Sequence, residues 1–169
     1  QGPAAAAPTA SMMGSYPIVH HRPLIHHHRP PPSIFAKYPH TDTYSFPRGK
    51  KCRVPGTIEA FEPATDTDPG VINCYAQCKP GRHDSPAKQG KGHDHGGKLD
   101  TAAKRVDWFT KCLEDITKIP GITSVAFPHG IGCDLAGGDW LTYQRILSEF
   151  AIKNPQITMI VCQLTKDSW

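Results

Sequence analysis

The stretch SVAFPHGIGCDLAGGDW, residues 124–140, decides the fold of this chain. A short apolar segment leads into a loop with four glycines, and an amphipathic helix is predicted directly after the loop. Because glycine adopts positive φ angles readily, such a loop can turn tightly and expose its backbone N–H groups. The helix starting near Asp139 adds unpaired amides and the positive end of its dipole. Together these features commonly bind a phosphate or pyrophosphate group.

The spacing of apolar residues on both sides of this loop predicts an α/β fold. Residues 101–118 carry one apolar stripe at helical spacing, with Asp100 as the expected N-cap and Pro120 just beyond the end. The other expected elements are a helical turn at 34–38, strands at 56–61, 70–77, 124–127 and 158–164, and a helix at 139–153. Helices that alternate with buried strands are typical of an α/β sandwich around a largely parallel sheet.

Several segments, in this order, resemble those of macro domains, the ADP-ribose-binding fold. The glycine loop is similar to the family's phosphate-binding loop, Phe-Pro-x-Gly-Ile-Gly-Cys-Gly-Leu-Ala-Gly-Gly-Asp-Trp, except that Asp134 stands where the family usually has glycine. The other matching segments are FAKYPHTDTY (35–44), PGTI (55–58), VINCYAQ (71–77) and DTAAKRVDWF (100–109). The resemblance spans about residues 35–164 and implies a macro-like three-layer α/β/α sandwich with a mixed, largely parallel sheet.

The first part of a complete macro domain has no clear counterpart in this sequence. The family opens with two strands, an Asp that binds adenine, and a loop rich in asparagine and glycine beside the distal ribose. The resemblance therefore predicts missing or degenerate first strands, with residues 16–21 as a candidate relic of the second strand. We accordingly expect a Pro/His/Ala-rich extended arm (1–33) and a partial macro-like domain (34–169) with a Gly/Lys-rich loop at 79–98.

The composition of the chain indicates which kinds of binding partner and cellular compartment to expect. The chain of 169 residues is about one domain long, and its formal net charge of +4 is too mild to predict nucleic acid as the main partner. No apolar stretch approaches the ~20 residues that span a bilayer. Six scattered cysteines favour free thiols in a reducing intracellular compartment. The acid-free start, residues 1–41, is compatible with an organellar targeting segment, and a disordered spacer explains it equally well.

The expected phosphate-binding residues belong to the glycine loop. They are Gly130, Ile131, Gly132, Cys133, Leu135, Ala136, Gly137 and Gly138. The alternative is that the loop is only a strand-to-helix connection inherited from a binding ancestor. Asp134 favours this alternative unless it faces solvent, because a carboxylate repels a diphosphate.

Three accessory candidates have structural alternatives. His129 has the chemistry of a general base, but we favour a packing role, since the family more often has an aromatic residue there. Asp139 is expected to contact the ligand or to cap the following helix. Asn73 lies on a predicted strand, where a structural hydrogen bond is the default interpretation.

Metal and cofactor sites find no support in the sequence. The histidine pair His93 and His95 lies among flexible glycines, and the histidines of the arm lie among prolines, so neither set has fixed ligand geometry. We therefore expect no metal and no cofactor. Some macro-domain deacylases have an Asp three residues beyond the loop cysteine; Ala136 occupies that position here, and no catalytic residue can be assigned.

These observations favour a degenerate macro-like domain, a pseudoenzyme retained as a structural or interaction subunit of a larger protein complex. Its extended arm would bind neighbouring proteins. The alternative is an ADP-ribose-binding module, or a hydrolase acting on ADP-ribose derivatives (an ADP-ribosyl hydrolase or an ADP-ribose 1''-phosphatase) that uses the glycine loop. The missing half and Asp134 favour the first hypothesis, and the preserved loop favours the second.

Overall fold

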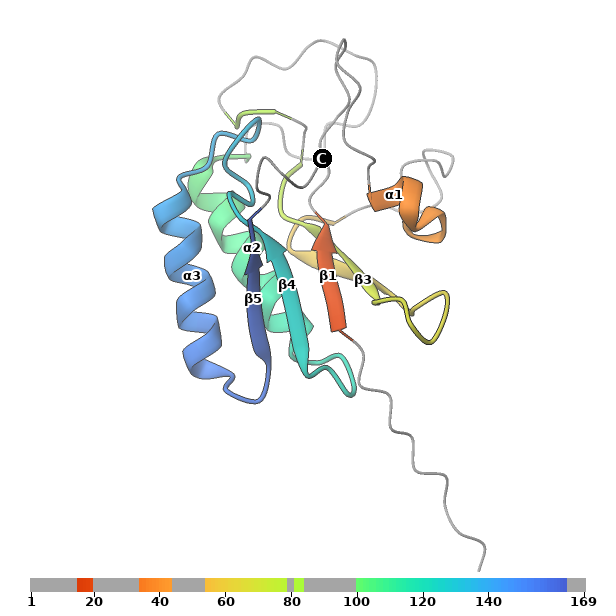
Figure 1. Cartoon of the computed structure of the whole chain (residues 1–169). Helices are drawn as coiled ribbons and strands as arrows, with labels where there is room; N and C mark the ends of the chain where they lie inside the picture. Colours follow the sequence, from red (N-terminus) through yellow and green to blue (C-terminus); the bar gives the residue numbers. More distant parts are fainter. Residues whose placement is uncertain (1–14, 20–33, 44–53, 79–80, 84–99, 164–169) are drawn as a thin grey trace, which may run out of the picture.

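The computed structural model describes residues 15–19, 34–43, 54–78, 81–83 and 100–163 of the chain. Strands and two long helices make up most of this part (Figure 1). The strands are β1 (Ser15–Val19), β2 (Thr57–Phe61), β3 (Val71–Tyr75), β4 (Ser124–Pro128) and β5 (Thr158–Cys162). The helices are α1 (Ile34–Lys37), α2 (Ala102–Ile116) and α3 (Trp140–Lys153), with a 3-10 turn at Pro39–Thr41.

The strands form a mixed sheet in the order β2-β3-β1-β4-β5. The first pair, β2 and β3, is antiparallel, with Ala60 opposite Ile72. Strand β1 runs parallel to β3 on one side and to β4 on the other, and β5 continues the parallel part beside β4. The fold is therefore α/β, with a mixed and largely parallel sheet.

The main core lies between the sheet and helices α2 and α3, which cover the same face (Figure 1). The ring of Phe109 on α2 lies 6.0 Å from the ring of Phe127 on β4 and 5.1 Å from that of Tyr143 on α3. One residue thus joins both helices to the sheet. Burial alternates along β4, where Val125 and Phe127 are fully buried and the residues between and beside them are less so. This period of two is what a strand covered on one face produces.

Helix α1 and the 3-10 turn pack on the opposite face, at β3. Tyr38 clusters with Val71, and the buried Asn73 donates from Nδ2 to the Thr41 carbonyl oxygen at 3.0 Å. Towards β5 this face is open among the described residues, where Ile160, paired with Ala126, is 43% exposed. The described residues thus form two complete layers and a small part of a third.

Strand β1 lies within the stretch 1–33 that we assigned to an extended arm. It overlaps residues 16–21, the candidate relic of the second strand, and is the central strand of the sheet. Pro17 is unusual there, since proline has no N–H to donate and central strands normally exclude it. The rest of the arm, and most of the Gly/Lys-rich loop at 79–98, lie outside the described residues.

Of the two predicted helix N-caps, the one for α2 is wrong and the one for α3 is confirmed. Thr101 caps α2 by accepting from the Lys104 amide at 3.2 Å, whereas Asp100, the expected cap, pairs with a side chain described below. Helix α3 begins as predicted, with the Asp139 carboxylate accepting from the Thr142 amide at 2.9 Å. None of the helices in the described ranges has the length and apolar character that crossing a membrane requires.

Replacing Phe109 with Ala should lower the free energy of unfolding by about 3–5 kcal/mol, because the cavity would open between both helices and the sheet. Denaturant unfolding followed by circular dichroism measures this change. The matched control is Ala103→Gly at an exposed position of the same helix, which should cost about 1 kcal/mol. Equal losses for the two variants would contradict the placement of Phe109.

Candidate functional site

The glycine loop, residues 129–139, follows β4 at the carboxyl edge of the parallel strands (Figure 1). Gly130, Gly132 and Gly137 have φ angles of 74°, 73° and 71°, which side-chain-bearing residues rarely adopt. At Gly138 the constraint is space, since an added Cβ would lie 2.5 Å from the Gly132 carbonyl oxygen. The backbone therefore needs glycine at all four positions.

Some of the loop amides are used within the loop itself. The amides of Ile131, Cys133, Gly137 and Gly138 donate to loop carbonyl oxygens or to that of Pro128, at 3.0–3.2 Å. The amides of the other four expected ligand residues have no hydrogen-bond partner among the described residues; these are Gly130, Gly132, Leu135 and Ala136. The hydrogen bonds of the first set shape the loop, and the second set takes no part in them.

The topology places this loop beside the position where such sheets bind ligands. From β1 the chain continues to β2 and β3 on one side of the sheet, and then to β4 and β5 on the other. In open α/β sheets the connections diverge at such a reversal, and ligands bind at the carboxyl ends of the strands there. Here the reversal lies between β1 and β4, so the glycine loop, which follows β4, flanks this point.

A buried arginine fastens the glycine loop to the rest of the site. Arg105, on the first turns of α2, is 3% exposed and forms a two-pronged ion pair with Asp100, with N···O distances of 2.5 and 2.8 Å. Its Nη1 also donates to the Gly81 carbonyl oxygen at 2.7 Å and to the Ala136 carbonyl oxygen at 3.1 Å. One guanidinium therefore connects α2, the segment after β3 and the glycine loop.

The two acidic residues of the loop have different roles. Asp139 caps α3 through hydrogen bonds from the Thr142 amide and hydroxyl, and these bonds lower the pKa of its carboxyl. Its carboxylate is thus committed to the helix, which was the structural alternative for this residue. Asp134 is exposed, and its carbonyl oxygen accepts from the Gly137 amide at 3.0 Å. An exposed carboxylate is better screened by solvent than a buried one.

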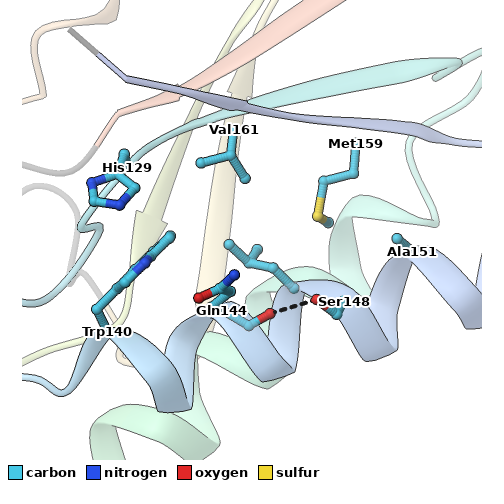
Figure 2. A pocket seen from close by; sticks show the side chains of 8 residues that line it. His129, Trp140, Gln144, Ser148, Ala151, Met159 and Val161 are labelled. Carbon is cyan, nitrogen blue, oxygen red and sulfur yellow. Dashed lines mark hydrogen bonds between the residues drawn. The ribbon is translucent and has the colours of Figure 1, made fainter. Parts of the chain in front are cut away.

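His129 and Trp140 stand at the two ends of the loop and pack against each other, with ring centroids 4.5 Å apart. This contact is the packing role that we favoured for His129 over general-base chemistry. Figure 2 shows both rings at one end of a shallow groove of about 350 Å³ between α3 and β5. The groove is lined by His129, Trp140, Gln144, Leu147, Ser148, Ala151, Met159 and Val161. Mostly apolar, it lies beside the loop and includes none of the expected phosphate-binding residues.

Asn73 lies in the sheet rather than among the loop residues. Its side-chain amide joins β3 to residue 41, which is the structural hydrogen bond expected as the default. Its Oδ1 atom is buried and has no hydrogen-bond partner among the described residues. No described contact connects Asn73 with the glycine loop.

Burial keeps the thiols and the phenol near the loop protonated at neutral pH. Burial raises the pKa of the half-buried Cys133 thiol, with a smaller contribution from Asp139. Burial also raises the pKa of Tyr143 to about 12, and the Tyr143 ring lies against Gly132. A poorly ionised thiol is a weak nucleophile, so the raised pKa argues against Cys133 as a nucleophile.

Metal ligands do not gather in the part of the chain that the structure describes, where no cluster of three or more His, Cys, Asp or Glu side chains could hold an ion. His93, His95 and the histidines of the arm lie outside it. Arg105 was not predicted from the sequence as a site residue. The detectable signal was an arginine on the apolar stripe of α2, four residues before Phe109.

Replacing Arg105 with Met should lower the free energy of unfolding by about 3–5 kcal/mol, because Asp100 would stay buried without a counter-charge. Thermal or denaturant unfolding measures this loss. Lys104→Met is the control: its 3.4 Å ion pair with Asp107 is more than half exposed and should contribute at most about 1 kcal/mol. A loss for Arg105→Met no larger than this control would contradict the fastening role.

The cap at Asp139 predicts an acid-sensitive contribution to stability. Because its folded pKa is depressed, this contribution is present above the unfolded pKa of about 3.9 and is lost as the pH falls through the folded pKa. In Asp139→Asn the amide still caps the helix but does not titrate. Between pH 7 and pH 2 the melting temperature of this variant should therefore fall less steeply than that of the wild type. Identical dependence on pH in the two proteins would contradict the proposed contribution of the Asp139 cap.

Comparison with known proteins gives no relative for this chain. A scan of family models, a search of curated proteins and a search of solved structures each found no match.

Proposed function

We propose that this chain is a macro-type module whose glycine loop binds the diphosphate of ADP-ribose or of an ADP-ribose derivative. The observation that supports this most is the loop itself. Its glycine-dependent backbone is fastened by a buried arginine, and it leaves the amides of Gly132, Leu135 and Ala136 for an anion. A loop that only connected a strand to a helix would not need to be fastened by a buried arginine.

The central position of β1 also favours ligand binding. The missing half, a main reason to expect a structural role, comprised the first two strands, an Asp that binds adenine, and a loop rich in asparagine and glycine; β1 supplies one strand of it, between β3 and β4. With β1 in place, the loop flanks the switch point of a parallel sheet. The three-layer macro-like sandwich is the architecture that this proposal requires.

The proposal concerns binding and does not extend to catalysis. Asp139 is used as a helix cap, His129 packs against Trp140, and burial keeps Cys133 protonated. Among the described residues none is therefore assigned the role of nucleophile or general base. A hydrolase acting on ADP-ribose derivatives would need further residues at this edge.

A second candidate function, an interaction subunit of a larger complex, is favoured by exposed apolar side chains on two elements. Four of the exposed large apolar side chains lie on α3 and β5; they are Leu141, Ile152, Ile160 and Val161. Exposed apolar side chains on an edge strand are typical of contact surfaces.

Asp134→Gly, which restores the residue usual in macro domains, should tighten ADP-ribose binding about two- to five-fold, because it removes a like charge near the diphosphate. Asp134→Asn should give a similar gain, which separates charge from backbone flexibility. Isothermal titration calorimetry measures both, and the gain should shrink at high salt.

The control for this prediction is Glu114→Gln, which removes an exposed acid from α2 and should leave the affinity unchanged. No binding of ADP-ribose by the folded wild type or by either Asp134 variant would refute the proposal and leave the interaction role.

A further inference from the structure

A second arginine, Arg82, lies directly against the glycine loop. A Cβ added to Gly137 would lie 3.0 Å from Cγ of Arg82, 3.3 Å from its Nε and 3.5 Å from its Cζ. The stem of the side chain and the start of the guanidinium therefore cover Gly137. Gly137 itself has a φ of 71°, so the loop backbone turns sharply where the arginine lies.

The position of Arg82 follows from the contacts of Arg105. The same Nη1 atom of Arg105 donates to the carbonyl oxygens of Gly81 and Ala136. Arg82 and Gly137 are the residues immediately after these two anchors. A single buried cation thus sets the distance between the segment after β3 and the glycine loop, and this brings the exposed Arg82 onto the loop.

The chemistry of Arg82 complements that of the neighbouring amides. A guanidinium presents donors in a planar fork that matches two phosphate oxygens, and it keeps its charge at any physiological pH. The amides of Leu135 and Ala136, next to Gly137, have no partner among the described residues. The loop also carries the exposed Asp134, whose carboxylate adds negative charge near a bound diphosphate, and Arg82 brings a positive charge to the same part of the loop.

We infer that Arg82 is a diphosphate-binding residue of this site, held in place by Arg105 as a positioning residue. This inference rests on the proposed function and names the side chain that supplies positive charge to it. A purely structural role, in which the stem of Arg82 only covers Gly137, is the competing explanation. The two explanations differ in whether the positive charge of Arg82 contributes to the affinity for the diphosphate.

The test compares Arg82→Met and Arg82→Lys in the full chain. Methionine retains an apolar stem over Gly137 and removes the charge, whereas lysine keeps the charge and loses the fork. Isothermal titration calorimetry with ADP-ribose should show about tenfold weaker binding or more for Arg82→Met, the size expected for a lost charged hydrogen bond. Arg82→Lys should fall between Arg82→Met and the wild type.

Arg145→Met is the matched control, since this arginine lies on the exposed side of α3 with Glu149 at 3.9 Å and should not affect binding. Inorganic pyrophosphate serves as a second probe, which lacks the nucleoside. If the wild type binds pyrophosphate, Arg82→Met should weaken binding of both probes. Melting temperatures of all variants establish that they are folded.

The outcomes separate the inference from the proposed function. If the folded wild type binds ADP-ribose and Arg82→Met binds it equally well, the inference alone is overturned. Loss of ADP-ribose binding with pyrophosphate binding intact would also overturn it, because Arg82 would then contact the nucleoside. A wild type that binds neither probe overturns both.

Discussion

The guanidinium of Arg105 is the interaction on which the site depends. It is buried, and a buried charge is stable only when its donors are matched by acceptors. Here the acceptors come from Asp100, from Gly81 and from Ala136, and more weakly from Gln77 at 3.5 Å. Three segments that are distant in the sequence must therefore meet at one point, or a charge remains unpaired in the protein interior.

The structure therefore has two parts, an apolar scaffold and the edge of the sheet that carries the glycine loop. The scaffold is the apolar layer in which Phe109 packs between α3 and β4, and it fixes the axis of α2. Because Arg105 is one helical turn before Phe109, the same helix carries both the core contact and the polar fastening. The packing of α2 in the core therefore also fixes the position of the glycine loop. A loop that is already in its binding conformation loses less conformational entropy when it binds a ligand.

The elements that could be predicted from the sequence are those with a strong local signal. Both long helices have apolar stripes with clear ends, and the loop has glycines that few other structures would need. The N-cap of α2 was assigned to Asp100 because nothing local shows that its carboxylate is taken by Arg105 five residues later. Residues 16–21 were only a candidate relic of a strand, and the central position of β1 was not predicted, because its five residues include Pro17 and follow no alternating pattern.

The candidate site could be predicted only in part, because only some of its residues are adjacent in the sequence and give a local signal. The loop residues are contiguous, so their pattern is visible in the sequence. Arg82 meets Gly137 across more than fifty residues, and only the folded arrangement brings them together. The role of Asp139 depended on one contact with Thr142, which the sequence allowed and did not require.

The central place of β1 has a consequence for how the chain folds. Its pairing with β3 joins residues more than fifty positions apart, and its pairing with β4 joins residues more than one hundred apart. Parallel pairings over such distances close slowly, because the entropy of a long loop is lost before any contact compensates for it. We therefore expect the helices and the β4–β5 pair to form first, and β1 to pair with β3 and β4 late in folding. A cut or a fusion near Ser15 would therefore act on the last step of assembly, at the middle of the protein.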